Sequence, residues 1–391
     1  MSPEAGPGRA VTGPSPPGVW PAGFVAGRAD RDALLVLAHL EGITPADRHR
    51  LAWREGTARA CLRAVAAGAA RGASARDRAV AERVEPGSVR ATLAGCGARM
   101  AAPGDQDYPP ALLDLTDPPM CLFVRGTLPN PRPAVAMVGA RRCTPYGREA
   151  AETIAAGLGA AGVTVVSGAA VGIDAAGHRG ALRAGGPTVA VLGSGIDEAY
   201  PPRNAGLIEE VARAGAVVSE YPPGIEARPH RFPARNRLVA ALAQGVIVVE
   251  GAPGSGSLIT VEFALDLGRD VMAVPGAITG QLSDVPHALI RDGAALIRGA
   301  GDVLETLGLA PARSPTSPKG VPDPDRDPPP TGLTEDERRF LELVPGTPAT
   351  LDAVASSAGV DPARALRVLG ALELRGLVTV DGGRYRRAGP G

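Results

Sequence analysis

Short β-branched runs alternate with helix-length stretches through the middle of the chain. Each run ends in Gly, Ser, Pro or Glu and is followed by a loop of small residues. The seven runs are AVAMVGAR (134–141), VTVVSGAAVGID (163–174), TVAVLGSGID (188–197), AVVSEYPPG (216–224), GVIVVEGAPGSGS (245–257), DVMAVPG (270–276) and AALIRG (294–299). Stretches such as REAAETIAAGLGAAG (148–162) separate them. This alternation is typical of βα units and predicts a parallel sheet that helices bury on both faces.

Two smaller helical regions flank the predicted sheet domain. Apolar residues recur at helical spacing in DALLVLAHL (32–40) and ARACLRAVAAGAA (58–70), which predicts a small all-α domain over residues 29–100. Near the other end, TEDERRFLELV (334–344), TLDAVASSAGV (350–360) and DPARALRVLGALELRGLV (361–378) indicate three helices. The last two have helix-turn-helix proportions, and VTVDGGRYRR, turning at Asp381 and Gly382, favours a two-stranded wing. Residues 333–391 are therefore predicted to form a winged helix, which could bind DNA or protein.

Pro-rich segments separate these regions. Residues 1–28 are rich in Pro and Gly and are predicted to form a disordered tail. The segment ARSPTSPKGVPDPDRDPPPTG (312–332) is polar and cannot build a core, so residues 311–332 are predicted to be a linker. Between the helical and sheet domains, YPPALLDLTDPP (108–119) predicts turns around one short helix.

The loops after the predicted strands carry groups that bind phosphate. Arg141, Arg142 and Thr144 follow the first run, and Ser167 and Gly168 follow the second. Others follow the fifth run: Ser255, Gly256, Ser257 and Thr260. The carboxyl ends of parallel strands gather at one edge of a sheet, where ligands of such domains bind. Hydroxyls and N–H groups at helix N-termini bind phosphate, and Arg adds bidentate charge. The loops therefore predict a site for a nucleotide or a phosphodiester.

A basic segment lies between the fourth and fifth runs. RPHRFPARNR (228–237) contains Arg228, Arg231, Arg235 and Arg237 and no acid. The chain as a whole has a formal net charge of zero, which argues against a uniformly basic surface. A local basic groove remains compatible with that balance, because the field in a cleft depends on nearby charges. We expect these arginines to contribute to the phosphate site.

Composition narrows the class of protein further. The four cysteines form no C-x-x-C pair, which disfavours a metal knuckle and a disulfide framework. Asp174 and His178 are spaced for one helix face, but no third ligand is spaced to complete a metal site. We expect no metal and no cofactor. Without a signal peptide or an apolar run near 18 residues, we expect a cytoplasmic protein with no membrane insertion.

The strongest indication of an enzyme is PGSGSLITVEF (253–263). It is similar to the P-G-G-x-G-T-x-x-E signature of the lysine-decarboxylase-like nucleotide phosphoribohydrolases. When Gly256 and Ser257 are placed on the Gly-Thr pair of that signature, Thr260 occupies the position of the catalytic Glu. Glu262 lies two residues further on, about 200° around a helix, so it points elsewhere. We expect no catalytic residue and no enzymatic activity.

Seven motifs in order resemble the DNA processing protein A family (DprA, also called Smf). They are MVGARRCTPYG, SGAAVGIDAAGHRGAL, GGPTVAVLGSGIDEAYPPRN, SEYPPG, FPARNRLVAAL, VVEGAPGSGSLITVEFAL and GRDVMAVPG. The resemblance covers residues 105–304 and is less specific in the two flanking domains. It implies an α/β fold whose 101–310 region is an extended Rossmann-like domain with a parallel or mixed sheet. The helical domain then resembles a SAM or helix-hairpin-helix module.

The resemblance also implies a function. Members bind single-stranded DNA, protect incoming DNA during natural transformation, help to load the RecA recombinase and form homodimers through the Rossmann-like domain. The apolar segment LVAALA (238–243) is a slender hint of such an interface. Carried over by position, the DNA pocket includes Gly139, Arg141, Ser167, Gly168, Asp174, His178, Phe232, Arg235, Asn236, Arg237, Ser255, Gly256, Ser257 and Thr260.

This sequence departs from the family pattern at three places. Ala140 stands where Ser is usual, Val171 where Arg is frequent, and Val285, Pro286 and His287 replace a common Gly-x-Asn stretch. These changes put some phosphate contacts in doubt. Two alternative functions stay open, a nucleotide phosphoribohydrolase on the same fold and a transcriptional regulator that acts through the winged helix.

Overall fold

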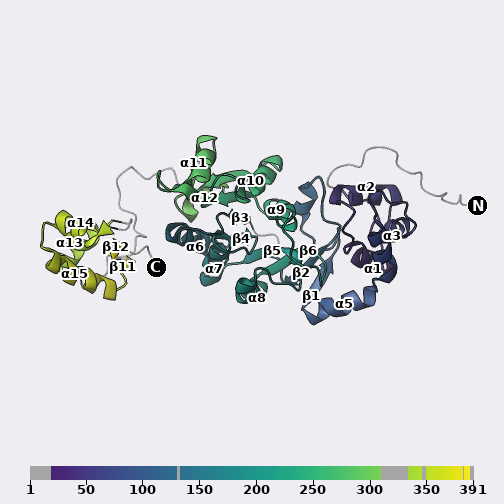
Figure 1. Ribbon diagram of the computed structural model, residues 1–391, viewed down its shortest axis with the longest axis horizontal. Helices are drawn as coiled ribbons and strands as arrows, with labels where there is room; N and C mark the ends of the chain where they lie inside the picture. The colour runs from purple at the N-terminus through teal and green to yellow at the C-terminus, as the bar shows by residue number, and fades with distance from the viewer. Residues whose placement is uncertain (1–18, 130–132, 310–332, 346–348, 382, 388–391) are drawn as a thin grey trace, which may run out of the picture. The chain divides into compact units, whose positions relative to one another are not determined.

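The computed structural model describes residues 19–129, 133–309, 333–345, 349–381 and 383–387. The chain divides into two compact units, residues 1–312 and 313–391 (Figure 1). The predicted linker, most of the predicted disordered tail and Gly382 of the predicted turn lie outside the described residues.

A nine-stranded sheet forms the centre of the first unit, in the order β1-β2-β6-β5-β4-β3-β7-β8-β9. The strands β3 to β9 run parallel, and each coincides with one of the seven predicted runs. Their bounds are β3 Ala134–Val138, β4 Thr164–Ser167, β5 Thr188–Gly195, β6 Ala216–Tyr221, β7 Gly245–Val248, β8 Asp270–Ala273 and β9 Ala295–Leu296. The predicted sheet is confirmed.

Two further strands extend the sheet on one side in the antiparallel sense. β2 (Leu122–Gly126) pairs with β6, and β1 (Ala98–Ala101) pairs with β2. The predicted boundary between helical and sheet domains at residues 100 and 101 therefore falls inside a strand. The short helix expected between them is η1 (Pro110–Asp114).

Helices cover both faces of the sheet (Figure 1). On one face, α6 (Pro145–Ala160), α7 (Ile173–Arg183), α8 (Ala205–Ala214) and α12 (Ala300–Thr306) pack against side chains such as Val165 and Ala190. On the other face lie α9 (Arg231–Ala241), α10 (Ser257–Asp266), α11 (Asp284–Arg291) and η1. The remaining short turns are η2 (Pro202–Asn204) and η3 (Gln281–Ser283). Residues 238–241 of α9 are fully buried in this second core, so the segment that hinted at a dimer interface is internal.

Five helices form the N-terminal region: α1 (Arg28–Leu37), α2 (Pro45–Glu55), α3 (Ala58–Ala66), α4 (Ala75–Arg83) and α5 (Pro86–Gly95). They share one apolar core with β2, β5, β6 and α8, so they belong to the same compact unit as the sheet. The end of the expected disordered tail is ordered, because Trp20 and Phe24 are buried and stack on each other with ring centroids 4.8 Å apart. Aromatic anchors of this kind bury large apolar areas, and they outweigh the Gly and Pro around them.

The second unit is the predicted winged helix. It contains α13 (Glu335–Leu343), α14 (Leu351–Ala358), α15 (Pro362–Leu374), β11 (Val378–Asp381) and β12 (Arg384–Arg387). Thr334 and Glu337 form a capping box, and Asp361 caps α15. A third strand, β10 (Ala349–Thr350), pairs with β12 and was not predicted, because two residues carry no periodicity.

Candidate nucleic-acid interface

The sheet has a topological switch point between β3 and β7. From β3 the chain moves to β4 on one side, whereas β7 continues to β8 on the other. Loops that leave neighbouring strands in opposite directions open a crevice at the carboxyl edge. A pocket of about 400 Å³ lies at this place. It is lined by Val138, Gly139, Ala140, Arg141, Ala170, Asp174, Phe232, Pro233, Arg235, Asn236, Ser255, Gly256, Ser257, Ile259 and Thr260. We call it the switch-point pocket.

The loop that follows β3 is held in place by Glu250, which the sequence did not single out. The buried Glu250 carboxylate accepts hydrogen bonds from the backbone N–H of Thr144, at 2.8 Å, and from its hydroxyl. Its carbonyl accepts the N–H of Ala140 at 2.7 Å. Gly139 is required for this close approach, because a Cβ there would lie 2.8 Å from the Glu250 carbonyl oxygen. Thr144 is thus an anchor of the loop and a cap of α6.

Arg235 is the buried cation of the pocket. It is 5% exposed and donates to the Val191 carbonyl. The absence of a side chain at Gly168 makes room for it, since a Cβ at that position would lie 2.6 Å from Arg235 Cζ. Burial lowers the pKa of Arg235 to about 10, while Asp174 opposes the shift. Arg235 therefore remains protonated at neutral pH.

Asp174 shapes the loop after β4. Its carboxylate accepts N–H groups from Gly168 at 3.2 Å and from Ala170 at 3.3 Å. Burial raises the pKa of Asp174, and Arg235 and the two N–H groups act in the opposite direction. Ser167 is fully buried, and its hydroxyl donates to the Met137 carbonyl at 2.7 Å. Ser167 and Gly168 therefore support the pocket from behind without lining it.

Phe232 lines the pocket, and Tyr200, which lies outside the lining, extends this aromatic platform. The guanidinium of Arg141 lies 5.7 Å from the Phe232 ring centroid. The ring centroids of Tyr200 and Phe232 are 5.2 Å apart, and the two rings are tilted relative to each other. Gly193 gives the ring its space, because a Cβ there would lie 2.8 Å from Phe232 Cδ1. Tyr200 was missed in the sequence because it precedes η2 and follows no predicted strand directly. Flat rings beside an Arg can stack on a nucleobase.

The start of α10 supplies the polar side of the pocket. The hydroxyls of Ser255 and Ser257 lie 2.5 Å apart, and Asn236 donates its amide to the Gly256 carbonyl at 3.2 Å. Ser257 is the first residue of α10, so the positive end of the helix dipole points to this side. Thr260 is buried one turn further on and also lines the pocket. Hydroxyls at a helix N-terminus are suited to bind phosphate.

Three of the four arginines of the basic segment bind carboxylates instead of facing the pocket. Arg237 is 4% exposed and donates to both oxygens of Glu220, at 2.9 and 2.8 Å, and to Asp117 at 3.4 Å. These acids raise the pKa of Arg237 further above its usual value, against the effect of burial. Its expected phosphate contact is therefore not supported by its placement.

Arg228 and Arg231 share Glu41 of the helical region. Their distances to its carboxylate are 3.2 Å and 2.7 Å, and Arg231 also lies over the Tyr221 ring. These partners are far away in sequence, which is why the segment was interpreted as a set of unpaired cations. Of the four arginines of this segment, the structure brings only Arg235 into the pocket lining.

His178 lies on α7 and does not line the switch-point pocket. It is fully buried, and its Nδ1 lies 2.7 Å from the hydroxyl of Thr188, the first residue of β5. Burial lowers its pKa to about 3. Thr188 begins β5, away from the carboxyl edge where the pocket lies, so the placement of His178 does not support its expected DNA contact. Arg142 is exposed beside the pocket and does not line it.

The departures from the family pattern have different surroundings. Ala140 lines the pocket, where a hydroxyl would reach the same space. Val171 is half-buried in the loop before α7. Val285 is buried against the sheet, and His287 lies with Nε2 3.1 Å from the Gly276 carbonyl.

Few groups in this pocket can perform acid or base chemistry. Asp174 is the only carboxylate among the described residues that line it, and it is occupied by backbone N–H groups. Glu262 is exposed on α10 and lies outside the lining, as the helix geometry predicted. Within the described residues, no group of three His, Cys, Asp or Glu side chains is arranged to hold a metal ion. No helix of the described part reaches the length and apolarity needed to cross a membrane.

Comparison with known proteins assigns the family. The family model described as DNA recombination-mediator protein A matches residues 99–308, and a DprA winged helix domain matches residues 324–384. The chain is similar to a putative DNA processing protein DprA of Mycobacterium tuberculosis, with 43% identity over 261 residues that cover 66% of each chain. It is also similar to Protein Smf of Escherichia coli, with 38% identity over 73% of this chain and 77% of that one.

A solved structure agrees with this assignment. The X-ray structure of DNA processing protein A from Streptococcus pneumoniae is 34% identical, with a TM-score of 0.58, and the match covers 71% of this chain and 98% of that one. The curated protein from that organism is 45% identical over 201 residues, 51% of this chain and 71% of its own length. The chain therefore belongs to the DNA processing protein A family.

Proposed function

We propose that this protein binds single-stranded DNA in the switch-point pocket and does not catalyse a reaction. The observation that carries the proposal is the combination of an aromatic platform, a buried cation and a helix N-terminus in one crevice. Each is suited to one part of a nucleotide. The membership of the chain in a DNA-processing family supports DNA as the ligand.

The proposed contacts follow from the chemistry of the pocket walls. A base stacks on Phe232 and Tyr200 beside the Arg141 guanidinium, which tolerates any sequence because every base has a π face. A phosphate lies between Arg235 and the Ser255 and Ser257 hydroxyls at the start of α10. A single strand exposes both its bases and its phosphates, whereas a duplex hides its base faces by stacking. The pocket thus favours single strands.

The alternative function, a nucleotide phosphoribohydrolase, requires a catalytic Glu that this pocket lacks among its described residues. Thr260 occupies the position where that chemistry needs Glu, and the exposed Glu262 lies outside the pocket. Asp174 is committed to the loop after β4. A nucleotide can therefore bind here without a general acid or base to cleave it. The transcriptional regulator alternative would place the primary DNA contacts on α15 of the winged helix instead.

The cellular role follows the family. We propose that the chain acts in the cytoplasm as a homodimer, protects incoming single-stranded DNA in natural transformation and assists loading of the RecA recombinase. The description of the family as recombination mediators supports this role. A dimer would place two switch-point pockets on one strand and raise its avidity. In sedimentation we expect a dimer at micromolar concentration, and a monomer at tens of micromolar would refute the dimer.

Fluorescence anisotropy with a labelled oligo(dT) tests the binding proposal. If Arg235 neutralises the phosphate in the pocket and Arg141 the neighbouring one along the strand, the logarithmic salt slope should be about −1.4 per protomer. Phe232→Ala should weaken binding about tenfold, since stacking of one base contributes ~1–3 kcal/mol. Arg179→Ala is the matched control, because Arg179 is exposed on α7 outside the pocket lining. Equal affinity for single and double strands, or equal losses in the control, would contradict the proposal.

A further inference from the structure

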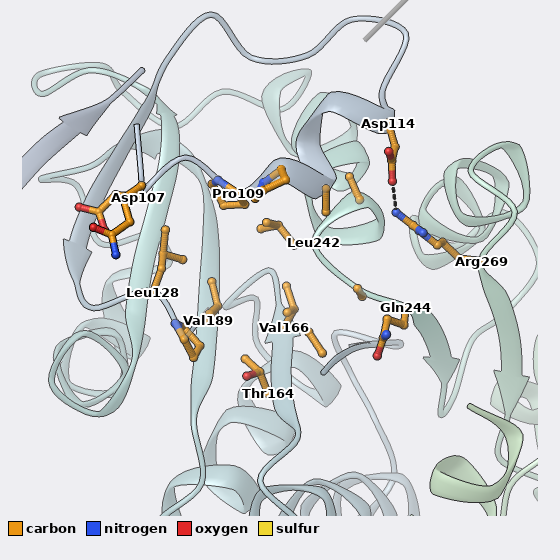
Figure 2. A pocket seen from close by; sticks show the side chains of 17 residues that line it. Asp107, Pro109, Asp114, Leu128, Thr164, Val166, Val189, Leu242, Gln244 and Arg269 are labelled. Atoms are coloured by element: carbon orange, nitrogen blue, oxygen red, sulfur yellow. Dashed lines mark hydrogen bonds and ion pairs between the residues drawn. The ribbon is translucent and has the colours of Figure 1, made fainter. Parts of the chain in front are cut away.

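A second pocket lies at the opposite edge of the sheet from the switch-point pocket. It also measures about 400 Å³ and is bounded by η1, by Leu128 and Pro129 after β2, by the end of α9 and by the amino ends of β3, β4 and β5 (Figure 2). Its floor and walls are apolar: Leu128, Pro129, Ala134, Val166, Val189, Ala241, Leu242 and Ala243. We call it the amino-edge pocket. The proposed DNA function leaves it without a role.

Two buried polar atoms in its wall lack a partner among the described residues. They are the hydroxyl of Thr164 and the Nε–H of Arg269. Thr164 is 1% exposed, and strand alternation places its side chain on the same face as Val166, toward the pocket (Figure 2). Buried polar groups in folded proteins are nearly always hydrogen-bonded, so two orphans beside one cavity indicate a ligand that satisfies them. Both can donate a hydrogen bond to a carbonyl oxygen.

The charges around the amino-edge pocket are already compensated. Arg269 lies 2.5 Å from Asp114 (Figure 2), and Asp107 lies 2.6 Å from Arg99, so among the described residues of this rim no cation is left unpaired for a phosphate. The carboxyl end of α9 adds partial negative charge, which favours a hydrogen-bond donor on the ligand. The two side-chain amides at the rim, Gln106 and Gln244, can pair with either kind of group. An uncharged ligand with carbonyl groups and an N–H matches this rim.

We propose that the amino-edge pocket binds an uncharged, flat heterocycle with carbonyl groups, the chemistry of a pyrimidine nucleoside. Its ring lies on the apolar floor of Val166 and Val189. Both donor atoms are shielded from solvent, so one carbonyl accepts from Thr164 after a rotation of that hydroxyl, and the other accepts from Arg269 Nε after a shift of that side chain. The ring N–H faces the end of α9. This site is independent of the proposed DNA function.

Saturation-transfer NMR with thymidine and the full chain tests the proposal. Thr164→Val keeps the shape of the side chain and removes one hydrogen bond, so affinity should fall about three- to tenfold. Ala111→Trp, at the mouth of the pocket in η1, should abolish the signal by filling the entrance without touching the sheet. The double variant Arg141→Ala, Phe232→Ala disables the switch-point pocket and should keep full thymidine binding.

Comparison ligands test the chemistry of the site. Adenosine lacks a ring carbonyl and should bind at least tenfold more weakly than thymidine. Thymidine 5′-monophosphate should bind no more tightly than thymidine, because the described residues of the rim offer no free cation. The proposal is overturned by an absence of signal at millimolar thymidine, or by a signal that disappears in the switch-point double variant and survives in Thr164→Val. Tenfold tighter binding of the monophosphate would equally overturn it.

Discussion

Gly168 offers a sharp test of the switch-point pocket, because it lies against Arg235 but does not line the pocket itself. A Cβ added there would lie 2.6 Å from Cζ of Arg235, well inside any real contact. The clash falls on the far end of a side chain and not on backbone. Gly168→Ala should therefore push the Arg235 guanidinium out of place and leave the fold intact.

The magnitude follows from the interaction that is displaced. A hydrogen bond to a charged group contributes ~1.5–3 kcal/mol, so loss of the Arg235 contact to phosphate should weaken DNA binding about tenfold to a hundredfold. Replacing Gly by Ala lowers the conformational entropy of the unfolded chain, which stabilises the folded state by about 0.4–1 kcal/mol. This gain offsets the local strain, so the free energy of unfolding should hardly change. Thermal unfolding measures this second part.

The assay is anisotropy with labelled oligo(dT) on four proteins: the unmodified chain, Gly168→Ala, Arg235→Ala and the double variant. If Gly168 acts only by making room for Arg235, the double variant should bind as Arg235→Ala does, with no further loss. Wild-type affinity in Gly168→Ala would refute the reasoning. Losses that add in the double variant would refute it as well.

Three further predictions concern other parts of the molecule. Incubation with nucleoside monophosphates should release no base above a control without protein, because Thr260 replaces the required acid. Base release by the unmodified chain that is absent in a Thr260→Val variant would contradict this prediction. Ending the chain at Leu309 removes the separate winged-helix unit and should change affinity for single strands only a few-fold, whereas a hundredfold loss, about 2.7 kcal/mol, would place the winged helix in the primary site. The lowered pKa of His178, about 3, means that the unfolded chain binds more protons than the folded chain between that pH and about 6.5. The free energy of unfolding of the protein should therefore fall by up to about 1.4 kcal/mol per pH unit as the pH drops through this window. In denaturant titrations, the free energy of unfolding of His178→Gln should depend less steeply on pH. An equal pH dependence in both proteins would contradict the lowered pKa of His178.

The strands and the switch-point loops could be predicted from the sequence because their determinants are local. A buried parallel strand needs a continuous β-branched run, and all seven such runs became β3 to β9. The two strands β1 and β2 were missed, since ARMA and LFVRG are short and mixed in character. Gly256, Ser257 and Thr260 reached the pocket because a strand end fixes where its loop goes.

Charge pairing could not be predicted in the same way. Arg237 meets Asp117, which is 120 residues away, and Arg231 meets Glu41 at a separation of 190 residues. A sequence motif shows which cations are close along the chain and not which acids the fold brings to them. Carboxylates that the fold brings to the basic segment leave one of its four arginines in the pocket. Glu250 was overlooked for the same reason, because its bond to Thr144 spans 106 residues.

Photocrosslinking from a thiothymidine-substituted single strand to the full chain, mapped by mass spectrometry, tests the central claim most directly. The account predicts crosslinks at Phe232 and Tyr200, with others in the loops that carry Arg141 and Ser255. These crosslinks should disappear when unlabelled single strand competes and persist when duplex does. Crosslinks confined to the winged helix, with none at the carboxyl edge of the sheet, would contradict the account.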